Sequence, residues 1–129
     1  MEKEIKIYNE YGEADGYVTR LDSEEFFNYL NNHLDEELVL EVKRYLAETN
    51  CKYFAVLKDL VVSSDERGKG HGTKLLKTFM AEAKRLPIIL ICDNLNSQLE
   101  GFVLEDWYLS HDFEYTPFKT ISGPILIKF

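Results

Sequence analysis

The residues of this chain best suited to chemistry form a glycine-rich segment, RGKGHG, that runs from Arg67 to Gly72. It follows the apolar run Leu60 to Val62 and precedes apolar residues at helical spacing, so the glycines stand where a strand turns into a helix. The first amides of a helix have no partner within it and lie at the positive end of its dipole. Glycine lets an anion approach them closely, and Arg67 and Lys69 add positive charge. The segment therefore predicts a site for a phosphorylated ligand that is held mainly by backbone.

Spacing separates the families of proteins that use glycine in this way. A Walker A loop requires Gly-x-x-x-x-Gly-Lys-Ser/Thr, but Gly72 is followed by Thr73 and Lys74. A dinucleotide-binding turn requires Gly-x-Gly-x-x-Gly, whereas this loop has the spacing Gly-x-Gly-x-Gly. Two other interpretations of the loop stay open: a turn that serves only close packing, and an enzyme that acts on a nucleotide phosphate.

The spacing that does fit is Arg/Gln-x-x-Gly-x-Gly/Ala, which Arg67, Gly70 and Gly72 satisfy. Upstream, the residues from 59 to 66 look like the strand that leads into such a loop. Downstream, the residues from 107 to 113 are similar to a Phe-Tyr-x-x-x-Gly-Phe segment, with aspartate at 112 in place of the usual glycine. Over roughly residues 52 to 129 the chain thus resembles the GNAT superfamily of N-acetyltransferases.

This resemblance implies an α/β fold of the α+β kind, a GNAT-like acyl-CoA N-acyltransferase fold whose mixed central sheet is flanked by helices. In that fold two central parallel strands splay apart to admit the pantetheine arm of the cosubstrate, acetyl-CoA. The implied reaction is direct transfer of an acetyl group from acetyl-CoA to a primary amine of an unidentified acceptor. A non-catalytic module of the same fold, which binds acyl-CoA or a partner without turnover, is the alternative.

The resemblance also implies which residues bind acetyl-CoA. The strand before the loop would run along pantetheine, the loop would hold the diphosphate, and an asparagine after the next strand would contact the cosubstrate, although turn formation is the simpler role for an asparagine there. These residues are Leu60, Val61, Val62, Arg67, Gly68, Lys69, Gly70, His71, Gly72, Thr73, Asn94 and Asn96.

Two residues are predicted to carry the catalysis. Tyr108, in the downstream aromatic segment, would protonate the departing CoA thiolate as general acid, and a main-chain N–H near Val62 would stabilise the oxyanion. Asp59 ranks first as general base, ahead of Asp93 and His111. The simpler roles are core packing for the tyrosine and a solvated edge charge for Asp59.

Composition limits the remaining choices. With 129 residues, 45% of them hydrophobic, the chain is predicted to form one N-acetyltransferase domain, with an acceptor-side part at residues 1–50 and an acetyl-CoA-binding part at 51–129. A net charge of −8 argues against nucleic acid or an anionic membrane as partner and suits a protonated amine, although keeping the protein soluble is the simpler role for this charge.

Location, metal content and assembly are predicted less directly. No apolar run is long enough to span a membrane and the N-terminus lacks the apolar core of a signal peptide, so a cytoplasmic location is expected. Cys51 and Cys92 have no metal-ligand spacing with the histidines, so no metal is expected. A homodimer formed by pairing the C-terminal strand across subunits is an arrangement that the sequence leaves open.

The elements that must position these residues can be followed along the chain. An N-terminal hairpin is predicted from strands at 4–8 and 17–21, with its turn in 12–16. Two helices follow, the first capped by Asp22 and the second capped by Asp35 and ending at Thr49 and Asn50. Only one strand fits between 51 and 62, where the resembled family has more, so the hairpin is expected to supply the missing sheet edge.

After the glycine loop the sequence predicts a helix from about Gly70 to Arg85 that Pro87 ends. The apolar run 88–92 then completes a β-α-β unit with parallel strands. A short helix at 104–111 and a closing hairpin of strands at 113–118 and 125–129 finish the chain.

Overall fold

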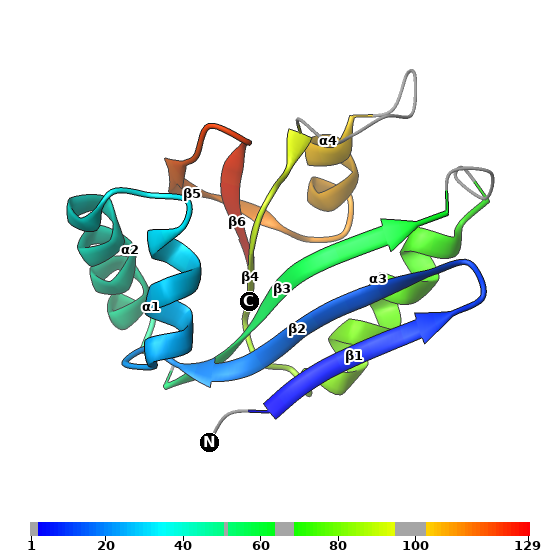
Figure 1. Cartoon of the computed structure of the whole chain (residues 1–129), viewed down its shortest axis with the longest axis horizontal. Helices are drawn as coiled ribbons and strands as arrows, with labels where there is room; N and C mark the ends of the chain where they lie inside the picture. Colours follow the sequence, from blue (N-terminus) through cyan, green and yellow to red (C-terminus); the bar gives the residue numbers. More distant parts are fainter. Residues whose placement is uncertain (1–2, 51, 64–68, 95–102) are drawn as a thin grey trace.

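The computed structural model of the protein describes residues 3–50, 52–63, 69–94 and 103–129. Six strands and four helices are found in these residues (Figure 1). Their order is β1 (Lys3–Asn9), β2 (Gly12–Arg20), α1 (Glu24–Asn31), α2 (Glu36–Glu48), β3 (Tyr53–Val62), α3 (His71–Glu82), β4 (Ile88–Ile91), α4 (Leu104–Leu109), β5 (Glu114–Lys119) and β6 (Pro124–Lys128).

The strands form a mixed sheet in the order β1-β2-β3-β4-β6-β5. Only β3 and β4 are parallel among the described pairs, and α3 connects them, as the β-α-β pattern predicts. The N-terminal hairpin pairs with β3 and so supplies the sheet edge that the sequence lacks before the glycine loop. The predicted mixed sheet flanked by helices is confirmed.

The two faces of this sheet are covered by different helices (Figure 1). The apolar side chains of α1 and α2 pack on one face, in a core cluster with Val56 of β3 and Ile89 of β4. Those of α3 and α4 pack on the other face, with Leu57 and Leu90. Neighbouring residues of β3 and β4 therefore point to opposite layers, as the period of a strand requires.

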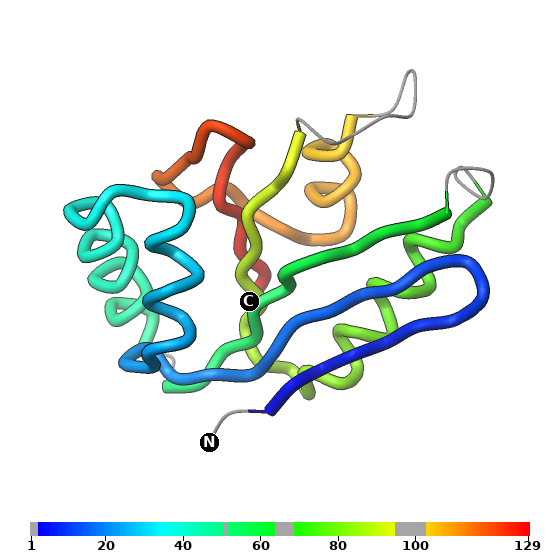
Figure 2. The backbone as a smooth tube through the Cα atoms, in the orientation of Figure 1, coloured from blue at the N-terminus to red at the C-terminus, as the bar shows by residue number. Residues whose placement is uncertain are grey.

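The central parallel pairing is short. Ala55–Leu57 pair with Ile88–Leu90, and there the ladder between β3 and β4 stops. Beyond it β3 continues to Val62 along β2, whereas β4 turns toward β6 (Figure 2). The sheet thus opens between the carboxyl ends of its two parallel strands, the edge at which ligands of α/β proteins bind.

A β-bulge accompanies this opening. Asp15 of β2 lies opposite Asp59 and Gly16 opposite Leu57, so Lys58 is an extra residue of β3. A bulge bends its strand and increases the local twist, which explains why β3 leaves β4 at this level.

The turn of the N-terminal hairpin was predicted within residues 12–16, and this prediction is wrong. Asn9 pairs with Gly12, so Glu10 and Tyr11 form a two-residue turn. The Oδ1 atom of Asn9 accepts from the backbone N–H groups of Tyr11 at 2.8 Å and Gly12 at 3.1 Å. The Asp-Gly pair that suggested a turn instead lies inside β2, where it meets the bulge.

Helix ends follow their capping groups. The oxygen of Ser23, one residue after the predicted cap Asp22, accepts from the backbone of Phe26 and begins α1. Asp35 caps α2 through the N–H of Leu38, as predicted. The predicted end of α3 near Arg85 and Pro87 is wrong: the helix ends at Glu82, because Lys84 and Arg85 adopt positive φ values of 51° and 67°.

At the C-terminus the predicted short helix and closing hairpin are confirmed by α4, β5 and β6. However, β6 lies between β4 and β5, so both of its edges are paired within the chain. The C-terminal strand therefore offers no free edge for a homodimer. No helix in the described ranges is long and apolar enough to cross a membrane.

Gly16 provides a test of the bulge. A methyl group at this position would overlap the carbonyl oxygen of Val56 and lie 2.9 Å from the ring of Phe79. We expect Gly16→Ala to lower the free energy of unfolding by about 1–3 kcal/mol in urea titrations, because the crowded sheet must shift.

Gly72→Ala is the matched control, because its methyl group would meet the chain only at ordinary distances of 3.6 Å and more. Its unfolding free energy should change by less than about 0.5 kcal/mol. Equal stabilities of the two variants would contradict the described contact of β2, β3 and α3.

Candidate functional site

The first turn of α3 has the features of an anion site. Gly70 precedes the helix in the left-handed conformation, with φ of 84°, and provides no side-chain cap. No acidic residue lies in the first turn, unlike those of α1 and α2. Negative side chains favour the positive end of a helix, so their absence leaves that position to an external anion. Lys69 is exposed beside this turn, whereas the other predicted cation, Arg67, and Gly68 lie outside the described residues.

The same turn contacts the other two segments that the sequence singled out. A methyl group at Gly72 would lie 3.6 Å from the ring of Trp107 in α4 and 3.7 Å from a methyl group of Val62 in β3. Thr73 Oγ1 lies 3.5 Å from Nε2 of His111, whose ring packs 4.8 Å from that of Trp107. The end of β3, the start of α3 and α4 therefore meet at one place.

The residues of β3 beyond the bulge point in alternating directions. Leu60 and Val62 pack into the layer of α3 and α4, whereas Val61 is 49% exposed on the other face. The backbone of these three residues, which are predicted to run along pantetheine, forms one side of the opening between β3 and β4. Their side chains do not share one face.

Tyr108 points from α4 into the core beside this opening. Its side chain is buried, with its ring 5.0 Å from that of Trp107 and 5.4 Å from that of Phe113. Burial raises the pKa of Tyr108, and the nearby Cys92, Tyr29 and Asp59 raise it further. The hydroxyl is therefore protonated at neutral pH and available as a hydrogen-bond donor.

Asp59 lies on β3 directly after the bulge and is exposed. It faces Asp15 across the β2–β3 pairing, and its charge helps to raise the pKa values of Tyr108 and Tyr29. Asp59 therefore lies near both tyrosines. The other predicted bases, Asp93 and His111, lie after β4 and after α4, and His111 is adjacent to the first turn of α3 instead.

Tyr29 belongs to the site but was missed in the sequence. It extends from α1 on the face opposite to Tyr108, and it hydrogen-bonds with the backbone of Ile91 at the end of β4. Burial raises the pKa of Tyr29, and so does Asp59. The two tyrosines therefore approach the opening from opposite layers. In the sequence, Tyr29 lies beside Phe26 and Leu30 on an amphipathic helix, and nothing there distinguishes it from a core residue.

The asparagine predicted to contact the cosubstrate has structural partners. Asn94 Oδ1 accepts from the thiol of Cys92 at 3.3 Å, and Asn94 Nδ2 donates to Glu105 of α4 at 3.1 Å. Tyr115 of β5 donates to the same carboxylate. Asn94 therefore links the end of β4 to α4 and β5, which fits its simpler role in a turn. The alternative, Asn96, lies outside the described residues.

Burial raises the pKa of the Cys92 thiol to about 12, with smaller contributions from Glu105 and Asp93. This thiol is therefore neutral and unreactive near pH 7 and serves as a donor in the network. Among the described residues, no three histidine, cysteine or acidic side chains are grouped so that they could hold a metal ion.

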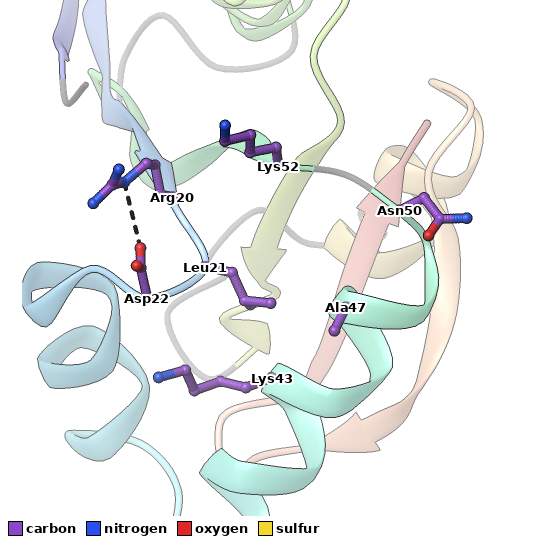
Figure 3. A pocket seen from close by; sticks show the side chains of 7 residues that line it. All are labelled: Arg20, Leu21, Asp22, Lys43, Ala47, Asn50 and Lys52. Carbon is purple, nitrogen blue, oxygen red and sulfur yellow. Dashed lines mark ion pairs between the residues drawn. The ribbon is translucent and has the colours of Figure 1, made fainter.

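A separate cavity of about 520 Å³ lies between the end of β2 and α2 (Figure 3). It is lined by Arg20, Leu21, Asp22, Lys43, Ala47, Asn50 and Lys52. Arg20 forms an ion pair with Asp22 at 3.3 Å. Arg20 ends β2 and Lys52 precedes β3, so this cavity is remote from the carboxyl ends of β3 and β4.

Comparison with known proteins agrees with this fold. A crystal structure of the anti-CRISPR protein AcrVA5 is similar in fold, with a TM-score of 0.52 and 18% sequence identity over 98% of this chain and 99% of that chain. A search of curated proteins finds no match. The family model described as the acetyltransferase (GNAT) family matches residues 6–103, and the chain therefore belongs to the GNAT acetyltransferase family.

Proposed function

We propose that the protein transfers an acetyl group from acetyl-CoA to a primary amine. Membership of the GNAT family supports acyltransferase activity in general. The observation that carries the proposal further is the opening between β3 and β4, with an uncapped helix start at one end and a buried tyrosine hydroxyl beside it.

The chain would bind acetyl-CoA in two ways. The amides of the first turn of α3, with Lys69 beside them, would hold the diphosphate. The edge of β3 beyond Leu57 has no ladder with β4, and pantetheine would run along it as an added strand. The carbonyl of the acetyl group would then lie in the opening, where the two tyrosines approach.

Transfer requires one bond to form and one to break. The neutral amine nitrogen attacks the thioester carbon, and a main-chain N–H of β3 between the bulge and Val62 would stabilise the oxyanion. When the carbon–sulfur bond breaks, Tyr108 would donate its proton to the thiolate. Near neutral pH the acceptor is an ammonium ion, and Asp59, directly or through a water molecule, would remove its proton before the attack. The proton that the nitrogen loses after the attack would pass through water to Tyr108 and replace the one given to sulfur. The protein then returns to its starting charge once Asp59 releases its proton to solvent.

The second candidate is an acyl-CoA-binding module without turnover. The exposure of Asp59 favours it, because a solvated carboxylate is a weak base for a protonated amine. The buried hydroxyl of Tyr108 beside the opening favours the enzyme.

Incubation with acetyl-CoA and a pool of amines separates the two. The pool should contain peptides with free N-termini or lysines, polyamines and amino sugars. Mass spectrometry should find at least one amine whose mass increases by one acetyl group and whose formation requires folded protein. Binding of CoA without any acetylated product would favour the module, and absence of both would refute the proposal.

Tyr108→Phe tests the general acid. The phenyl ring preserves the packing against Trp107 and Phe113 but removes the proton. We expect kcat to fall about 100-fold while the Kd for CoA changes less than about twofold. Tyr115→Phe, which removes an exposed hydroxyl on β5, is the control and should keep kcat. Unaltered turnover in Tyr108→Phe would remove the assignment.

Asp59→Asn tests the base. Turnover should fall at least about tenfold at pH 7, and the deficit should shrink as the pH approaches the pKa of the acceptor amine. The reason is that more acceptor is already neutral at high pH and needs no base. Asp15→Asn, across the β2–β3 pairing, is the matched control. A deficit that is the same at every pH, or one as large in Asp15→Asn, would argue against Asp59 as base.

A further inference from the structure

The tip of the N-terminal hairpin lies against the start of α3 (Figure 1). The rings of Tyr11, in the turn between β1 and β2, and His71, the first residue of α3, are stacked with their centroids 3.9 Å apart and their planes 17° apart. These residues are 60 positions apart in the chain, and the contact exists because β2 runs beside β3 as far as Val62.

The backbone of Tyr11 is held on both sides. Its N–H donates to Oδ1 of Asn9 at 2.8 Å, and its carbonyl oxygen accepts from the N–H of Ser63 at 2.8 Å. Ser63 is the last described residue before the glycine loop, and His71 is the residue after Gly70. One residue of the hairpin therefore contacts both the entry to the loop and its exit into the helix.

Residues from several other elements thus contact the first turn of α3. Trp107 of α4 and Val62 of β3 lie beside Gly72, and His111 lies beside Thr73. Tyr11 provides the corresponding contact for His71, the first residue of the turn. Amides that are already fixed in the bound arrangement lose less conformational entropy when a ligand binds.

We infer that Tyr11 is a positioning residue for the diphosphate of acyl-CoA, and that it acts through its stack on His71. The inference rests on the proposed function, because it concerns the same binding site. Tyr11 need not touch the cosubstrate: its ring fixes His71, and His71 begins the turn whose amides would bind the anion.

The test compares Tyr11→Leu, which loses the stack, with Tyr11→Phe, which keeps a ring. Titration calorimetry with CoA should give a Kd about three- to tenfold higher for Tyr11→Leu, as expected for the loss of one aromatic pair, and a Kd within about twofold of wild type for Tyr11→Phe. Tyr8→Leu is the matched control, because Tyr8 lies on the same hairpin and is 75% exposed. Its Kd should not change.

A second donor distinguishes positioning of the diphosphate from general packing. S-acetylpantetheine lacks the diphosphate, so kcat/KM with this donor should be within about twofold of wild type in Tyr11→Leu, whereas KM for acetyl-CoA should rise about three- to tenfold. An unchanged Kd for CoA, an equal loss in Tyr8→Leu or Tyr11→Phe, or an equal loss with both donors would overturn the inference. Failure of the wild-type protein to bind CoA would instead refute the proposed function.

Discussion

The candidate site exists because the hydrogen-bonded pairing between β3 and β4 stops after three residue pairs. Three residue pairs join these strands, and the extra residue Lys58 then bends β3 away along β2. A sheet that continued its ladder would bury both strand edges and leave no room between them. The loss of a few hydrogen bonds at this point creates the opening on which the proposed binding of acyl-CoA depends, and the N-terminal hairpin stabilises the diverging half of β3 by pairing with it.

The helices on the two faces of the sheet bring different chemical groups to this opening. The layer of α3 and α4 contributes a helix start suited to an anion and the buried hydroxyl of Tyr108. The opposite layer contributes Tyr29 and leaves Asp59 exposed. A donor with a diphosphate fits the first layer. The proposed acceptor, a protonated amine, would approach from the second layer, in a chain whose net charge is −8.

Local signals predicted much of this arrangement from the sequence. The glycine spacing and the apolar run after it predict the β-α-β unit, and Asp35 predicts the start of α2, because these features act over a few neighbouring residues. What was missed depends on distant contacts. The Asp15-Gly16 pair is typical of a turn, but Gly16 is required where β2 passes close to Val56 and Phe79. Tyr29 has an ordinary position in an amphipathic helix, and only tertiary packing brings it to Ile91. Asp112 stands where the resembled segment usually has glycine, and it adopts the left-handed conformation that glycine favours, with φ of 71°.

Amide hydrogen exchange with and without saturating CoA shows which strands and helices the bound ligand covers. If CoA lies in the opening, exchange should slow in peptides that cover residues 58–63 and 69–75, and it should be unchanged in α2, which lines the separate cavity. Protection confined to α2 and the end of β2, or no protection in β3 and α3 although CoA is bound, would contradict binding of CoA between β3 and β4.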